Sequence, residues 1–152
     1  TQVAEYKGHM RPYDFAHLIN KLCLDYCYAK VTKPLLAVER NNHGHAVLLE
    51  LSEHLNYPNL FEHKDNRIGW KTDSVTRPIL LNSFIDAIEN DSIKIIGQQT
   101  LKECLTLINN NGKIEAMPNH HDDLIMATSI AIQLAIAEKE VSSETLTSKI
   151  RT

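Results

Sequence analysis

The stretch that decides the fold class is "PLLAVE" at residues 34–39, followed by "RNNHGHAVLLEL" at residues 40–51. The first six residues form a continuous apolar run that ends in the carboxylate of Glu39, which predicts a short strand buried on both faces. Residues 41–44 break this run, and the pattern of residues 46–55 predicts a helix. A buried strand followed directly by a helix is the repeating unit of α/β folds.

The same alternation extends in both directions along the chain. Further strands are predicted at residues 2–6, 59–63 and 92–96, and further helices at residues 12–30, 76–89 and 98–104. Asn111-Gly112 supplies the positive φ angles of a tight turn and predicts a hairpin within residues 106–117. We therefore expect an α/β domain with a largely parallel sheet, edged by an antiparallel hairpin near the C-terminus.

The last predicted helix begins at "NHHDDL", residues 119–124, and runs into the apolar segment 124–137. That segment is shorter than the roughly 20 residues that cross a bilayer, so it predicts a buried helix and no membrane partner. Asp122 is most simply the N-cap of this helix, and Asp123 is an acid favoured by the helix dipole. A helix cap needs only one acid, however, so capping does not explain why a second acid is present. Residues 1–140 are expected to form one domain, and residues 141–152 a polar, frayed tail.

Composition limits the classes of protein that need consideration. With 152 residues, 43% hydrophobic and 23% charged, the chain has the composition of a folded globular domain. A formal charge of −3 argues against a protein that coats nucleic acid by bulk attraction, so any polyanion site must be local. Three cysteines without C-x-x-C spacing, and no secretory signal, favour a reducing cytoplasm. The absence of an initiating Met suggests a fragment.

Glu39, Asp122 and Asp123 are the candidate catalytic and metal-binding residues. Glu39 ends the most apolar predicted strand and the two aspartates open the last helix, which an α/β architecture can bring to one rim. Carboxylates without cysteine ligands suit Mg²⁺ or Mn²⁺, and a pair of such ions is the usual device for hydrolysing a phosphodiester. The structural alternative for Glu39 is a surface acid paired with Arg40 or a lysine.

A basic cluster could supply the nucleic-acid contacts of such a site. Its members are Lys64, Arg67, Lys71 and Arg77, with the single tryptophan, Trp70, among them. Cations interleaved with an aromatic residue can grip and stack on a nucleic-acid strand. The alternative interpretation is a solvated, charge-rich surface loop.

These motifs resemble the C-terminal nuclease domain of the large terminase subunit, the DNA-packaging enzyme of tailed bacteriophages and prophages. The resemblance rests on "LLAVERNNHGHAVLLEL" (35–51), "IGWKTDSVTRPILL" (68–81) and "GKIEAMPNHHDDLIMATSIA" (112–131), in that order. It implies an RNase H-like mixed sheet flanked by helices. The implied activity is a two-metal endonuclease that cuts concatemeric double-stranded viral DNA in the host cytoplasm.

Position by position, the resemblance carries catalytic and metal-binding roles to Glu39, Asp122 and Asp123, and leaves open which aspartate binds metal directly. His121 and Asn41 are candidates for supporting these ligands through hydrogen bonds. The family's implied partners are an N-terminal ATPase motor, the portal and the small terminase subunit. This sequence contains no G-x-x-x-x-G-K-[ST] loop, so we expect no ATP hydrolysis from it.

One departure from the family pattern lowers the expected activity. Family members carry a further catalytic Asp on a first strand, and this sequence begins after the position where that strand would lie. Asp14 is predicted at a helix start and is a poor substitute. We therefore expect the first strand to be missing and this fragment to be a weak or inactive nuclease.

Three alternatives remain at the level of sequence. HD phosphohydrolases also bind metal through a His-Asp pair, but in an all-helical fold. A catalytically silent module could bind DNA or dock on the packaging motor. Resolvases and integrases are other RNase H-like enzymes with the same metal chemistry.

Overall fold

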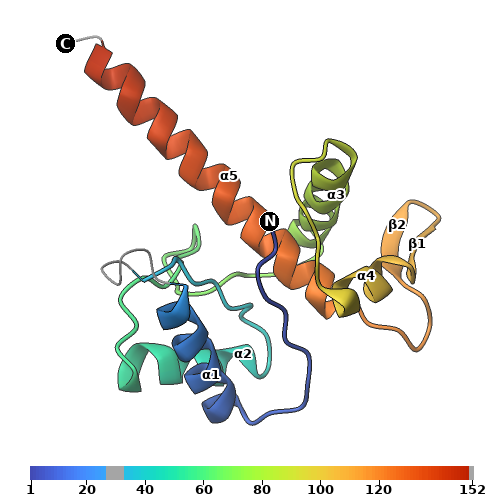
Figure 1. Cartoon of the computed structure of the whole chain (residues 1–152), viewed down its shortest axis with the longest axis horizontal. Coiled ribbons are helices and arrows are strands. Elements are labelled where there is room, and N and C mark those ends of the chain that lie inside the picture. The colour runs from blue at the N-terminus through green and yellow to red at the C-terminus, as the bar shows by residue number, and fades with distance from the viewer. Residues whose placement is uncertain (27–32, 151–152) are drawn as a thin grey trace. The chain divides into compact units, whose positions relative to one another are not determined.

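The computed structural model describes residues 1–26 and 33–150, with side chains as far as residue 138. The chain is mixed α/β (Figure 1). In order, its elements are α1 (Pro12–Asp25), α2 (Gly44–Leu49), the π-helix η1 (Glu50–His54), α3 (Thr76–Glu89), α4 (Gln98–Cys104), β1 (Leu107–Asn110), β2 (Lys113–Ala116) and α5 (Asp123–Ile150).

The elements belong to two compact units. The first unit combines Thr1–Lys7 with Val75–Thr152, and the second unit is Gly8–Ser74. The N-terminal segment therefore belongs with helices that follow it by some ninety positions in sequence, as its hydrogen bonds to Lys94 and Thr100 illustrate. The expectation of one domain over residues 1–140 stays a prediction.

The second unit is built on α1, α2 and η1. Its core consists of Ala16 from α1, Val47 and Leu51 from the α2–η1 segment, and Tyr57. Leu36 and Val38 of the predicted strand pack against this core, so that segment is anchored by its apolar side chains. The sequence predicted one helix over residues 46–55, and the structure has α2 and η1 in continuous succession there.

The first unit is built on α5, which packs against α3 and α4. The residues of α5 that are buried are Leu124, Ile125, Met126, Ser129, Ile130 and Leu134. The apolar run of the last helix is therefore buried as predicted, and it packs on other helices. On α3 the buried face is Leu80, Leu81, Phe84 and Ala87, while Ile79 and Ile88 are exposed.

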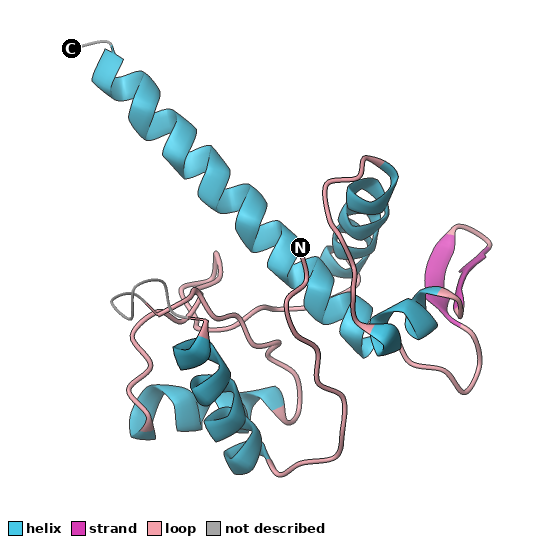
Figure 2. Ribbon diagram, in the orientation of Figure 1, coloured by secondary structure: helices cyan, strands magenta, loops and turns pink. Residues whose placement is uncertain are grey.

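The hairpin is the one regular sheet in the part of the chain that the structure describes (Figure 2). β1 and β2 pair antiparallel, with Leu107 opposite Ala116 and Asn110 opposite Lys113. Asn111 and Gly112 both have positive φ, 51° and 86°. A Cβ on Gly112 would meet no atom within 4 Å, so the glycine serves the backbone angle. The predicted hairpin is confirmed.

The predicted parallel strands are not formed as strands within the described residues. Residues 34–40 make single parallel bridges, Leu36 to Leu60 and Glu39 to Trp70, and neither extends into a ladder. Residues 2–6 and 92–97 are joined by the backbone N–H of Gln2, which donates to the Lys94 carbonyl at 2.9 Å, and by side chains. The Gln2 Oε1 atom accepts from the backbone N–H groups of Ile96 and Gly97, which a neighbouring strand would otherwise use.

The helix predictions are confirmed at different levels of accuracy. α3 and α4 begin and end at the predicted residues, 76–89 and 98–104. α1 ends at Asp25, and the predicted end near Lys30 lies outside the described residues. The helix α5 continues to Ile150, through the residues for which the sequence predicted a frayed tail. This mixed class differs from the all-helical fold of the HD phosphohydrolases.

Candidate functional site

The start of α5 is capped by a carboxylate that the sequence analysis did not consider. Glu103, on α4, is only 6% exposed, and its Oε2 atom accepts hydrogen bonds from the backbone N–H groups of Leu124 (2.8 Å) and Ile125 (3.1 Å). These N–H groups are among those that a helix start leaves without partners. Asp122 keeps the N-cap position, because its carbonyl accepts from the Met126 N–H at 2.8 Å, but the side-chain cap predicted for it is supplied by Glu103.

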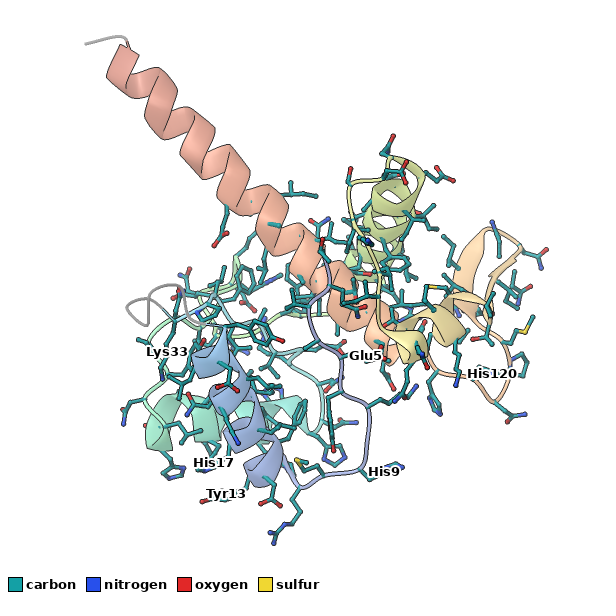
Figure 3. All side chains as sticks on the ribbon, viewed as in Figure 1. Glu5, His9, Tyr13, His17, Lys33 and His120 are labelled. Carbon is teal, nitrogen blue, oxygen red and sulfur yellow. The ribbon has the colours of Figure 1, made fainter. Side chains whose placement is uncertain are left out.

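The N-terminal segment holds Glu103 and α4 in place. Lys7 donates from Nζ to the Glu103 Oε1 atom. The Glu5 carboxylate accepts from the backbone N–H groups of Gln99 and Thr100 and from the Thr100 hydroxyl, at 2.9–3.0 Å, and so caps α4 (Figure 3). The backbone hydrogen bonds from Gln99 and Thr100 lower the pKa of Glu5. Two helix starts in the first unit are thus fixed by acids distant in sequence.

The two aspartates of the motif have different partners. Asp122 forms an ion pair with Arg77, and its side chain is 14% exposed. Asp123 is exposed at the first residue of α5, and among the described residues its carboxylate has no ion-pair or hydrogen-bond partner. Arg77, a predicted DNA contact, is therefore engaged with Asp122, and Asp123 is the surplus acid. His121, the residue before Asp122 in sequence, is exposed. We call Lys7, Arg77, Glu103, Asp122 and Asp123 the α5 corner.

Glu39 lies at a second corner, in the second unit. The Asn41 side-chain amide donates to Glu39 Oε2 at 2.9 Å, the supporting contact anticipated for Asn41. A Cβ on Gly44 would lie 1.8 Å from the Glu39 carbonyl oxygen, so only glycine lets α2 start this close to the strand end. Arg40 pairs with Asp65 at 2.8 Å, which excludes the simple Glu39–Arg40 pair among the structural alternatives.

The predicted basic loop surrounds an aromatic cluster. Lys64 and Arg67 are exposed, and Lys71 lies 3.4 Å from Asp73. The Trp70 ring stacks on Phe61 with centroids 5.6 Å apart and meets His63 edge-on at 5.4 Å. The indole is therefore half-buried among its own neighbours, a packing role that the sequence analysis did not assign to it.

Four buried polar atoms of this region have no hydrogen-bond partner: Arg40 Nε, His63 Nδ1, Trp70 Nε1 and Thr72 Oγ1. A buried donor left unpaired costs about 1–3 kcal/mol. Across the described side chains, the unsatisfied buried atoms all belong to these four residues. We call them, together with Glu39, the Glu39 corner.

The donor chemistry of the candidate metal ligands suits a hard cation, because carboxylate oxygens are what Mg²⁺ and Mn²⁺ prefer. Glu39 belongs to the second unit, and Asp122 and Asp123 belong to the first. Within the residues described, no three His, Cys, Asp or Glu side chains form a group that could hold a metal ion. The structure thus leaves the convergence of the three acids as a prediction.

A third cluster, formed by Glu50, His17 and His54, was not predicted from the sequence. Glu50, buried where η1 begins, contacts His54 Nδ1 at 2.6 Å and His17 Nε2 at 3.2 Å. Figure 3 shows His17 on α1. The spacing of Glu50 and His54, four residues on a predicted helix, was the available signal. His17 could not be foreseen because it comes from another helix.

A comparison with models of known protein families found no match, and a comparison with curated proteins found no significant similarity. In the portion of the chain that is described, none of the helices has the length and apolar character needed to span a membrane.

Proposed function

We propose that the chain is a metal-dependent endonuclease domain of the terminase type, with an RNase H-like architecture, acting on double-stranded DNA. The observation that carries the proposal is the capping of α5 by the Glu103 carboxylate, which leaves the side-chain carboxylates of Asp122 and Asp123 unused for capping. A helix start fixed from outside holds two carboxylates in place without using either for the helix.

In this proposal, Glu39, Asp122 and Asp123 are the residues that would hold Mg²⁺ or Mn²⁺, and Arg77, which pairs with Asp122, would contact the DNA. When bound, such ions supply an activated water and stabilise the leaving oxygen of a phosphodiester. The exposed cations Lys64 and Arg67 contact the DNA backbone, and Lys71 contributes from the same loop. Asn41 orients the Glu39 carboxylate.

The proposed substrate and partners are those that the family resemblance implies. The substrate is concatemeric viral DNA in the host cytoplasm. The partners are an ATPase motor domain, the portal and the small terminase subunit.

The decisive test is shared metal binding. Substoichiometric Mn²⁺ is added to the isotope-labelled chain, and paramagnetic broadening of backbone amide resonances is measured. We expect the strongest broadening at residues 39–42 and 121–124 together, because one ion would contact both groups. Asp123→Ala and Glu39→Ala should each abolish broadening at both places. Broadening confined to one of the two places would overturn the shared site.

A matched control is Asp86→Ala, which removes another exposed helical acid of the first unit. It should leave the broadening unchanged. Asp123→Ala should also leave the free energy of unfolding within about 1 kcal/mol of the original, as expected for an exposed side chain. A larger loss of stability would assign Asp123 a structural role.

A second candidate is a catalytically silent module that binds DNA, favoured by the Arg77–Asp122 ion pair. A carboxylate already neutralised by a guanidinium is a weaker ligand for a cation. This candidate predicts DNA binding with no Mn²⁺ broadening at Asp122 and Asp123. In both cases Lys64→Gln and Arg67→Gln should weaken DNA binding and flatten its salt dependence, because fewer counterions are released.

A further inference from the structure

The loop formed by residues 61–70, called here the 61–70 loop, packs closely against Arg40 at its base. The Gly69 N–H donates to the Phe61 carbonyl at 2.7 Å and so joins the two ends of the loop. A Cβ on Gly69, whose φ is 87°, would lie 2.5 Å from Leu48 Cδ1 and 2.8 Å from Arg40 Cγ. Glycine therefore lets the loop return this close to the Arg40 side chain.

The tip of this loop carries two cations and one acid. Lys64 and Arg67 are exposed, and neither has an ion-pair partner among the described residues. Asp65 lies between them in sequence, in the turn that is closed by a hydrogen bond of 2.8 Å from the His63 N–H to the Arg67 carbonyl. An unpaired carboxylate at this place would offset one of the two positive charges and would repel a polyanion.

Arg40 supplies the charge that compensates Asp65. Its Nη2 atom donates to the Asp65 carboxylate at 2.8 Å. The Arg40 side chain is only 7% exposed, whereas that of Asp65 is 40% exposed, so Arg40 is too buried to meet a partner itself. The hydrogen bond from Arg40 is the main reason why the pKa of Asp65 lies below its ordinary value of 3.8. The pair is therefore ionised at neutral pH, and the charges of Lys64 and Arg67 remain available at the surface.

We propose that Arg40 and Asp65 are positioning residues, which hold the 61–70 loop so that Lys64 and Arg67 meet the phosphate backbone of double-stranded DNA. This role rests on the DNA contact in the proposed function, to which it adds the residues that support the loop. A turn that is anchored in advance binds more tightly than a free one, because a free loop loses conformational entropy when it is ordered by its partner. Arg40 thus contributes to binding from inside the fold.

Charge and anchoring lead to opposite expectations for Asp65, which makes the role testable. Asp65→Ala removes a negative charge from the loop, so electrostatic attraction alone would strengthen DNA binding. If Asp65 anchors the loop, the same change should weaken binding about fivefold. The matched control is Glu62→Ala, which removes the same charge from an exposed position of the same loop that has no ion-pair partner among the described residues. Glu62→Ala should bind DNA at least as tightly as the original chain.

The experiment is a titration of a short fluorescein-labelled DNA duplex with the full chain in EDTA, repeated at several salt concentrations. EDTA removes divalent ions, so the result is independent of the proposed metal site, which the Mn²⁺ experiment tests separately. The slope of log affinity against log salt concentration falls by about 0.9 for each phosphate contact that is lost. Asp65→Ala should therefore show a shallower slope, close to that of a variant that combines Lys64→Gln and Arg67→Gln. A residue that only stabilised the fold would leave this slope unchanged.

Arg40→Met provides a second measurement from the buried side of the ion pair. It removes the guanidinium and leaves the Asp65 charge uncompensated beside the two cations, so binding should be weaker than in Asp65→Ala. In the Arg40→Met background, Asp65→Ala should no longer weaken binding, because the anchor is already lost. Asp65 is exposed, so its single variant tests the role even if Arg40→Met fails to fold.

Three results would overturn the positioning role. If Asp65→Ala bound DNA as tightly as Glu62→Ala, the loop would not need its anchor, although Lys64 and Arg67 could still contact DNA. If Glu62→Ala weakened binding as much as Asp65→Ala, the effect would not be specific to the Arg40–Asp65 pair. If the original chain did not bind the duplex at all, the DNA contact itself would be wrong, whatever the Mn²⁺ experiment showed.

Discussion

The α5 corner and the Glu39 corner differ in whether their buried polar groups have hydrogen-bond partners. In the α5 corner, Glu103 is matched on both oxygens, one by Lys7 and the other by two backbone N–H groups. In the Glu39 corner, Arg40 is paired on one nitrogen and unpaired on another, and His63, Trp70 and Thr72 each have a buried side-chain atom without a hydrogen-bond partner. Both corners carry a candidate catalytic acid, but only one of them is internally complete.

This difference separates a buried polar network whose members are all paired from one whose members are partly unpaired. A buried network in which every member is satisfied stabilises the fold, whereas an incomplete one stays costly until a partner arrives. Glu103 and Lys7 are therefore assigned to the architecture of the first unit. Asp123 remains exposed at the edge of this network, and its carboxylate has no partner among the described residues.

The largest expected effect comes from making the α5 corner incomplete. Glu103→Ala would leave the Lys7 ammonium and the N–H groups of Leu124 and Ile125 without their acceptor. It should lower the free energy of unfolding by about 3 kcal/mol. Denaturant unfolding measures this loss. Glu103→Gln, which keeps an acceptor oxygen for the helix, should lose roughly half as much. If both variants lost less than about 1 kcal/mol, the corner would not be the stabilising network described.

The next effect tests the tight packing of the Glu39 corner. Gly44→Ala places a Cβ 1.8 Å from the Glu39 carbonyl oxygen, and should cost about 2 kcal/mol although alanine favours helices. Because Glu39 is bridged to Trp70, the tryptophan fluorescence should change as well. Gly112→Ala is the control, since it meets no neighbour and costs only about 1 kcal/mol through its positive φ. If the fluorescence of Gly44→Ala were unchanged, a displacement of Glu39 would not affect Trp70, and the expected link between the two residues would be wrong.

The smallest effect is a pH dependence of the α4 cap. Hydrogen bonds from Gln99 and Thr100 hold the pKa of Glu5 below its usual value of 4.5. The stabilisation is therefore fully present above pH 4.5 and is lost as the pH falls through the lower folded pKa. The amide resonances of Gln99 and Thr100 should follow that titration, and Glu5→Gln should abolish it. A midpoint at or above 4.5 would contradict the cap.

The parts of the fold that were predictable depend on residues close together in sequence. The Asn111-Gly112 turn, and the bounds of α3 and α4, follow from local backbone preference and apolar spacing. The parallel strands were predicted from apolar runs of similar quality, yet a strand also needs a partner along its whole length. Residues 34–40 form one bridge to Leu60 and one to Trp70, and no short sequence pattern predicts these two partners.

For the candidate site, the sequence by itself determined the position of two acids at the start of the last helix and one at the end of an apolar run. Only the tertiary structure decided their roles. Glu103 caps α5 from 21 residues away, Arg77 reaches Asp122 across 45, and Lys7 reaches Glu103 across 96. Helices and turns are selected by neighbouring residues, whereas the charge that satisfies a buried carboxylate or guanidinium can come from any segment that packing brings within about 3 Å.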